Sequence, residues 1–97
     1  LSLVYNNLLN DLQLQAADVP LLAGEMVSAA QGGKCASMNA ILATLPKAIP
    51  TAHVISSADC PASSDGLHFT AEGYRMLGKR YAAQMLALMG VILTEIK

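Results

Sequence analysis

The sequence has little charge and few aromatic side chains. Its 97 residues include six Lys and Arg, seven Asp and Glu, one Phe, three Tyr and no Trp, and the net charge is −1. The six basic residues are scattered and form no stripe of the kind that binds the phosphates of a nucleic acid. We therefore expect no nucleic acid among the partners of this chain.

Long hydrophobic runs are also missing. The longest candidate, residues 85–94, is interrupted by Gly90 and flanked by Gln84 and Glu95, whereas a membrane-spanning helix needs about 20 apolar residues. The first residues lack the charged start and small-residue cleavage site of a signal peptide. We expect no membrane partner, and the alternating apolar tail over residues 91–97 has no role that the sequence assigns.

Apolar residues, by contrast, are abundant. They make up 54% of the chain, and the mean hydropathy is +0.43, against about 45–50% apolar residues in ordinary soluble domains. A short chain this apolar needs a cover for its surface. Because Leu1 to Tyr5 begin inside a helical pattern without a cap, we expect residues 1–97 to be the C-terminal part of a single domain. Its core would be shared with an N-terminal portion or a second chain.

Helical and extended patterns alternate along the sequence. They predict a helix over residues 3–17, a strand over 19–26, a helix over 36–45, a strand over 53–56 and a helix from Thr70 to Gly90. This alternation predicts an α/β fold with a parallel sheet. Such sheets commonly have about five strands, so we expect the remaining strands to lie N-terminal to Leu1.

The two longest helices should each turn one stripe towards the core. In the first helix this stripe is Val4, Leu8, Leu9 and Leu12, and in the last it is Tyr74, Leu77, Tyr81, Met85 and Leu88. Thr70 is a suitable N-cap for the last helix, because its hydroxyl can accept a hydrogen bond from a free backbone N–H.

The segment from Asp65 to His68 is the candidate catalytic element. It follows the second predicted strand, and loops at the carboxyl ends of parallel strands are where ligands bind in such folds. A carboxylate that orients an imidazole is part of the machinery of serine hydrolases. The alternative is structural, because Asp65-Gly66 is also a common turn and His68 could then be an ordinary surface residue.

Asp65-Gly66-Leu67-His68-Phe69-Thr70, followed by Glu72-Gly73-Tyr74 and a helix, resembles the final block of the SGNH, or GDSL-type, hydrolases. More narrowly, it is similar to the sialate O-acetylesterase and acetylxylan esterase branch, carbohydrate esterase family six. Upstream, the apolar run 20–25, Asn39 and the segment 54–59 agree with this resemblance, which spans residues 3–89.

The resemblance implies a partial three-layer α/β/α fold of the flavodoxin-like SGNH type, with its N-terminal strands outside this chain. It also implies a serine ester hydrolase that removes acetyl groups from xylan or sialic acid without a cofactor. His68 would be the general base and Asp65 its orienting partner.

The nucleophile of that family lies in a Gly-x-Ser block near its N-terminus, and no serine of this chain has such a setting. Ser63 and Ser64 lie beside Asp65, but serines before a turn are commonly hydrogen-bonding residues of the loop. We therefore expect the nucleophile to come from outside this chain and the isolated chain to be inactive.

Cys35 and Cys60 stand 25 positions apart and form no metal-binding pair. Their spacing, with His53 and His68, fits no zinc finger or ribbon, so we expect no metal site. A disulfide between the two cysteines is possible, because both would lie at the same edge of the sheet, and it would suit a secreted or periplasmic enzyme.

A different class of function stays open. The chain could be a non-catalytic interaction module, or a homo-oligomer or swapped dimer that closes through its apolar surface. In that case the His68 ring would face solvent with no carboxylate on its second nitrogen.

Overall fold

The computed structural model describes residues 1–90. In chain order their elements are α1 (Ser2–Leu12), the 3-10 turn η1 (Ala16–Asp18), β1 (Leu21–Gly24), the 3-10 turn η2 (Ala29–Gln31), α2 (Met38–Leu42), α3 (Leu45–Ala48), β2 (Ala52–Ile55) and α4 (Ala71–Leu88). The residues of the tail, 91–97, lie outside the described part of the chain.

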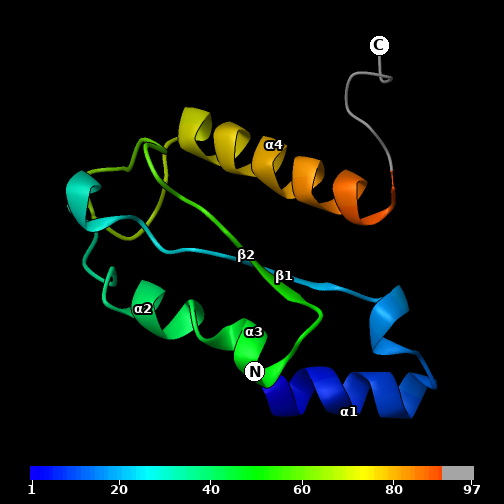
Figure 1. The fold of residues 1–97 in the computed structure, drawn as a ribbon. Helices are drawn as coiled ribbons and strands as arrows, with labels where there is room; N and C mark the ends of the chain where they lie inside the picture. The colour runs from blue at the N-terminus through cyan, green and yellow to red at the C-terminus, as the bar shows by residue number, and fades with distance from the viewer. Residues whose placement is uncertain (91–97) are drawn as a thin grey trace.

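β1 and β2 form a two-stranded parallel sheet, in which Leu21 pairs with Ala52 and Gly24 with Ile55. Figure 1 shows α4 on one side of the strands and α2 and α3 on the other, with α1 beyond them. Helices therefore cover both faces, which is what parallel strands require. The predicted α/β class is confirmed.

The core consists of two separate clusters. One surrounds Tyr5, Ile49 and Ala52, where α1 and α3 meet the start of β2. The other surrounds Ile55, Cys60 and Leu77, between the end of β2 and α4. The second cluster lies beneath the loop that carries Asp65 and His68.

α1 is shorter than predicted, and of its predicted stripe only Leu9 packs against the core. The helix ends at Leu12, because Gln13 adopts a left-handed conformation with φ 55°. Val4 and Leu8 are exposed, and Tyr5 is buried instead. The Tyr5 hydroxyl bonds to the Val19 carbonyl oxygen at 2.6 Å. A polar group that needs buried partners therefore decides which face of α1 turns inward.

The predicted helix over residues 36–45 is divided into α2 and α3. Pro46 lies in the first turn of α3, where its missing N–H costs nothing, whereas inside a continuous helix it would remove a hydrogen bond. The Thr44 hydroxyl donates to the Ile41 carbonyl oxygen at 2.6 Å. Proline therefore starts a new helix here as well as ending one.

α4 begins where the sequence predicts, with Thr70 as its N-cap. Leu77 is buried as expected, and Tyr81 reaches β1, since a Cβ placed on Gly24 would lie 2.4 Å from the Tyr81 hydroxyl. Met85 and Leu88 are exposed, contrary to the prediction. Tyr74 also differs from the prediction. It is half exposed and meets the Phe69 ring edge-on, with 5.5 Å between the ring centroids.

Large apolar side chains are exposed along α1 and on α2. They include Leu1, Leu3, Val4, Leu8 and Leu12 on and beside α1, and Met38 and Ile41 on α2. No helix among residues 1–90 is long and apolar enough to span a bilayer.

Candidate active site

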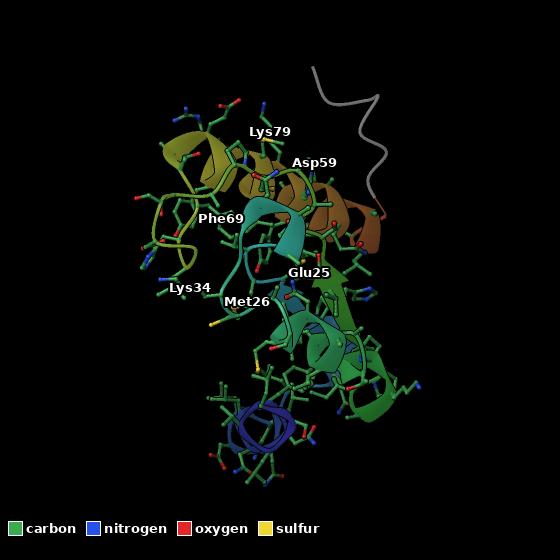
Figure 2. The ribbon with its side chains drawn as sticks, turned by 90° about the vertical axis from the view of Figure 1, so that its left-hand side faces the viewer. Glu25, Met26, Lys34, Asp59, Phe69 and Lys79 are labelled. Carbon is green, nitrogen blue, oxygen red and sulfur yellow. The ribbon has the colours of Figure 1, made fainter. Side chains whose placement is uncertain are left out.

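Both strands end at the same edge of the sheet, and polar groups tie the two ends together. Glu25 follows β1, and its carboxylate accepts from the backbone N–H of Ser57, after β2, at 2.9 Å. The Ser57 hydroxyl donates to the Met26 carbonyl oxygen at 2.6 Å. Figure 2 looks onto this edge, with Glu25 and Met26 labelled.

Asn39 of α2 binds the backbone of Met26, the residue after Glu25, through both ends of its side-chain amide. Its side-chain oxygen accepts from the Met26 N–H at 2.7 Å, and its amide nitrogen donates to the Met26 carbonyl oxygen at 3.2 Å. In the sequence Glu25, Asn39 and Ser57 stand far apart, in separate segments that agree with the family resemblance. Their common role becomes visible once the parallel strands bring their carboxyl ends together.

The loop after β2 folds into a tight turn. Ala62 and Phe69 form an isolated antiparallel bridge, and the Ser63 N–H donates to the His68 carbonyl oxygen at 2.8 Å. Gly66, at the tip, has φ 70°, and a Cβ there would lie 2.8 Å from the Gly32 carbonyl oxygen. The turn therefore needs glycine for both its conformation and its space.

Asp65 and His68 meet across this turn. The Asp65 Oδ2 and His68 Nδ1 atoms are 2.6 Å apart. Asp65 Oδ1 accepts from the backbone N–H groups of Leu67 at 2.8 Å and His68 at 2.9 Å, and from the Ser63 hydroxyl at 2.8 Å. One carboxylate oxygen thus anchors the turn, and the other is left for the imidazole.

These donors favour the ionised form of Asp65. The hydrogen bond from the His68 side chain has the largest effect, followed by the N–H groups of His68 and Leu67 and by the Ser63 hydroxyl, and together they hold the pKa of Asp65 well below its ordinary value. A carboxylate without a proton can only accept, so the proton of this bond lies on His68 Nδ1. The lone pair of a neutral ring is then on Nε2.

The pair lies at the surface. The His68 side chain is 68% exposed and that of Asp65 44%. The alternative hypothesis of an interaction module predicted a solvent-facing His68 ring without a carboxylate partner. In the structure the ring is exposed but does have a carboxylate partner, Asp65. Water screens an exposed pair, so the geometry fixes the orientation of the ring more than it adds to stability.

Thr70 joins this loop to α4. Its hydroxyl oxygen accepts from the Gly73 N–H at 3.1 Å, and its own N–H donates to the Pro61 carbonyl oxygen at 3.0 Å. A Cβ on Gly73 would lie 2.3 Å from that same carbonyl oxygen. The start of α4 and the base of the Asp65 loop therefore pack backbone against backbone.

The disulfide between Cys35 and Cys60 that the sequence left possible is not formed in this structure. Cys35 is exposed and Cys60 is buried, and both are free thiols. Cys60 is fully enclosed in the cluster with Ile55 and Leu77. A disulfide needs two sulfur atoms within bonding distance, and the structure leaves the two thiols unbonded.

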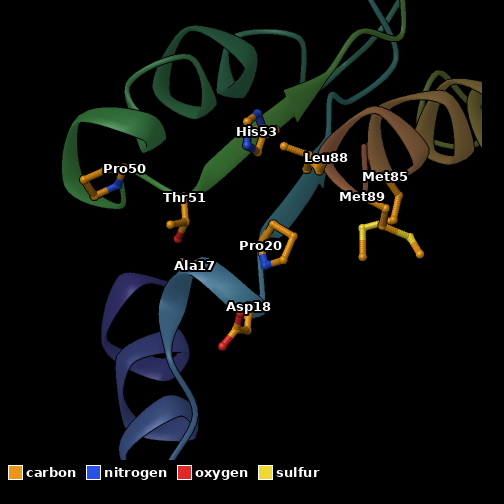
Figure 3. A pocket seen from close by; sticks show the side chains of 9 residues that line it. All are labelled: Ala17, Asp18, Pro20, Pro50, Thr51, His53, Met85, Leu88 and Met89. Carbon is orange, nitrogen blue, oxygen red and sulfur yellow. The ribbon is translucent and has the colours of Figure 1, made fainter. Parts of the chain in front are cut away.

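The remaining sequence candidates are separated. His53 lies in β2 and lines a hollow of about 350 Å³ near the start of the strands, together with Thr51 and Met85 (Figure 3). His68 lies beyond the other end of the strands. No hydrogen bond joins a serine hydroxyl to His68 Nε2 within residues 1–90.

Comparison with known families gives one match that covers most of the chain. Residues 2–87 match the model of a family described as carbohydrate esterase, sialic acid-specific acetylesterase. The chain belongs to this family. The match confirms the resemblance to the sialate O-acetylesterase branch of the SGNH hydrolases. No solved structure matches the chain.

Membership of the acetylesterase family also gives the α/β fold its SGNH assignment. The matched range includes both strands, the turn from Asp65 to His68 and most of α4. The chain is therefore a member of a carbohydrate acetylesterase family, and the turn at the carboxyl edge of its sheet is its candidate active site.

Proposed function

We propose that this chain supplies the acid-base element of an acetylesterase that acts on O-acetylated sialic acids. His68 is the general base and Asp65 orients it. The observation that carries the proposal is the 2.6 Å contact between Asp65 Oδ2 and His68 Nδ1, which leaves the other ring nitrogen, Nε2, free of the carboxylate. The sialic acid class rests on the description of the matched family.

The reaction follows from the position of the proton. His68 Nε2 takes the proton of a serine hydroxyl as the serine oxygen attacks the carbonyl carbon of the acetyl ester. The tetrahedral intermediate then collapses, the bond to the sugar oxygen breaks, and His68 gives its proton to that oxygen. Water repeats the sequence on the acetyl-serine, so that acetate leaves and the serine regains its proton.

The nucleophile in this proposal comes from outside residues 1–90. Ser57 is buried and donates to Met26, and the Ser56 hydroxyl oxygen accepts from the Ala58 N–H at 3.1 Å. Ser63 donates within the turn itself. No serine hydroxyl of residues 1–90 is hydrogen-bonded to His68 Nε2. In this proposal a serine on a second polypeptide, or on another portion of the same domain, completes the site.

The first experiment uses the 97-residue chain alone. We expect only slow, non-enzymatic hydrolysis of 4-nitrophenyl acetate by the unchanged chain and by His68→Ala, because the base has no serine to activate. An enzymatic rate that His68→Ala abolishes would show that the serine lies within this chain after all.

The second experiment restores the nucleophile. The chain is joined to the Gly-x-Ser portion of another sialic acid-specific acetylesterase, and acetate release from O-acetylated sialic acid is measured. We expect His68→Ala to lower kcat by about 10²–10⁴-fold, as for other general bases. Asp65→Asn should also lower kcat, because it no longer holds the proton on Nδ1.

The chain offers matched controls for both substitutions. His53→Ala changes the other histidine, near the opposite end of the strands, and Asp18→Asn changes an exposed carboxylate beside the same hollow. Both should keep kcat within about twofold of the unchanged chimera, as expected of changes away from the site. A folded chimera that is inactive, or equally active without His68, would contradict the proposal.

A further inference from the structure

Ser63 makes hydrogen bonds in the candidate active site through both its backbone and its side chain. Its N–H donates to the His68 carbonyl oxygen at 2.8 Å, and its carbonyl oxygen accepts from the Gly66 N–H at 3.2 Å. Its hydroxyl lies 2.8 Å from Asp65 Oδ1 and 3.1 Å from the His68 carbonyl oxygen. The backbone of Ser63 thus closes the turn, and its side chain addresses the carboxylate.

The single proton of this hydroxyl has two acceptors to choose from. The His68 carbonyl oxygen already receives the Ser63 N–H, whereas Asp65 Oδ1 carries negative charge and is nearer. Hydrogen bonds to charged acceptors are stronger than those to neutral ones. The proton therefore belongs on the bond to Asp65.

The hydroxyl is the one side-chain donor to Asp65 Oδ1 among the described residues. The other two donors are the N–H groups of Leu67 and His68, which belong to the turn that the carboxylate itself organises. A carboxylate held at one oxygen from three directions cannot rotate freely. Its second oxygen then stays opposite His68 Nδ1.

From this geometry we infer that Ser63 is a positioning residue, which locks the Asp65 carboxylate so that His68 keeps its proton on Nδ1 and its lone pair on Nε2. The catalytic meaning of this lock rests on the function proposed above for His68. Ser63 is not the nucleophile, because its hydroxyl faces Asp65 and not the Nε2 side of the ring.

If the Ser63 hydroxyl only held the loop together, its removal would disrupt the turn. The turn retains its bonds from Ser63 N–H to His68, from Gly66 N–H to Ser63 and from Lys34 N–H to Gly66, at 2.9 Å, when the hydroxyl is removed. Ser63→Ala should therefore preserve the fold of the loop and remove only the constraint on the carboxylate.

The test follows the protonation of the His68 ring in the 97-residue chain by two-bond ¹H–¹⁵N NMR, at a pH where the ring is neutral. In the unchanged chain we expect the Nδ1–H tautomer to dominate. In Ser63→Ala its ratio to the Nε2–H tautomer should fall about threefold to tenfold, the effect of one charge-assisted hydrogen bond near the surface.

The same samples give a second readout at Asp65. Its carboxyl carbon is followed through an acid titration, and Ser63→Ala should move that titration upward, because one donor to the ionised form is gone. Ser63→Thr keeps the hydroxyl and should retain both signatures. Ser64→Ala is the matched control, since the neighbouring serine is exposed and its side chain makes no hydrogen bond among the described residues.

Ser63→Cys provides an independent route to the same loss. Its thiol has nearly the size of the hydroxymethyl group but is a weak donor. The amide spectrum of α4 reports whether each variant is folded. If a folded Ser63→Ala or Ser63→Cys keeps the tautomer ratio and the Asp65 titration of the unchanged chain, the inference is overturned.

These measurements need neither a nucleophile nor a substrate. An inactive chimera would contradict the role proposed for His68 and leave the lock intact. Conversely, an unchanged ring in Ser63→Ala would remove the lock and leave His68 as the candidate base.

Discussion

The two ends of this molecule differ in how fully their apolar side chains are buried. At the carboxyl end of the strands, the loop that carries Asp65 and His68 rests on the buried cluster of Ile55, Cys60 and Leu77. At the other end, α1 touches the rest of the chain through Tyr5 and half-buried Leu9, and its remaining leucines are exposed.

The difference shows which interactions a short chain can complete by itself. The active-site turn is built mainly from hydrogen bonds between residues close in sequence, within 61–70. One further bond, from the Lys34 N–H to the Gly66 carbonyl oxygen, and the buried cluster beneath the loop support it. The apolar stripes of α1 need partners from other layers, because burial requires neighbours on several sides. The site is therefore organised in a chain whose core is not fully covered.

The largest test of this contrast concerns two glycines of α4. Gly73→Ala places a methyl group 2.3 Å from the Pro61 carbonyl oxygen, so backbone must move, and we expect a loss of about 2–4 kcal/mol in the free energy of unfolding. At Gly78 a Cβ meets no atom within 4 Å, so Gly78→Ala should stabilise the helix by about 0.5–1 kcal/mol. Urea titration of both variants measures the difference.

The second test compares leucines from the two ends. Leu77→Ala empties part of the cluster beneath the site, and it should cost about 2–3 kcal/mol. Leu8 on α1 is 53% exposed, so Leu8→Ala should cost less than about 0.5 kcal/mol. Equal losses in thermal or urea unfolding would show that α1 is as well packed as α4.

The third test compares two N-caps. The Thr70 hydroxyl accepts from the Gly73 N–H, whereas Ser37, before α2, makes no side-chain capping bond. Thr70→Ala should lower the free energy of unfolding by about 1 kcal/mol, and Ser37→Ala should have a smaller effect. Circular dichroism during thermal unfolding reports both, and a larger loss at Ser37 would reverse the contrast.

The smallest effect is expected from pH. The pKa of Asp65 in the folded chain lies below its ordinary value, chiefly because of the hydrogen bond from His68. The turn is therefore stabilised fully above about pH 4, the pKa of a free aspartate, and it loses this contribution as the pH falls towards the folded value. Asp65→Asn should remove this part of the acid dependence of the thermal midpoint, and Asp18→Asn should retain it.

Much of the fold follows from local patterns. The N-cap at Thr70, the start of α4 and the alternation of helices with parallel strands were predicted, because capping and periodicity act over a few residues. The inward face of α1 was not, since apolar spacing favours Val4 and Leu8 but the buried partners of the Tyr5 hydroxyl favour Tyr5.

In the candidate site, too, local features were predicted and long-range contacts were not. The spacing of Asp65 and His68 identified the pair, and the glycine between them identified the turn. The network of Glu25, Asn39 and Ser57 could not be predicted, because its members lie far apart in sequence and meet only where two parallel strands end.

The sequence alone determined the carboxylate-imidazole pair and the helix that follows it, because these depend on residues within a few positions of one another. It also determined the family, through a match that extends over residues 2–87. The tertiary structure decided which nitrogen of His68 meets the carboxylate, that Ser63 holds that carboxylate and that Cys35 and Cys60 stay apart. The first two outcomes depend on the three-dimensional path of the loop after β2, and the third on the enclosure of Cys60 in the core. Spacing in the sequence encodes neither.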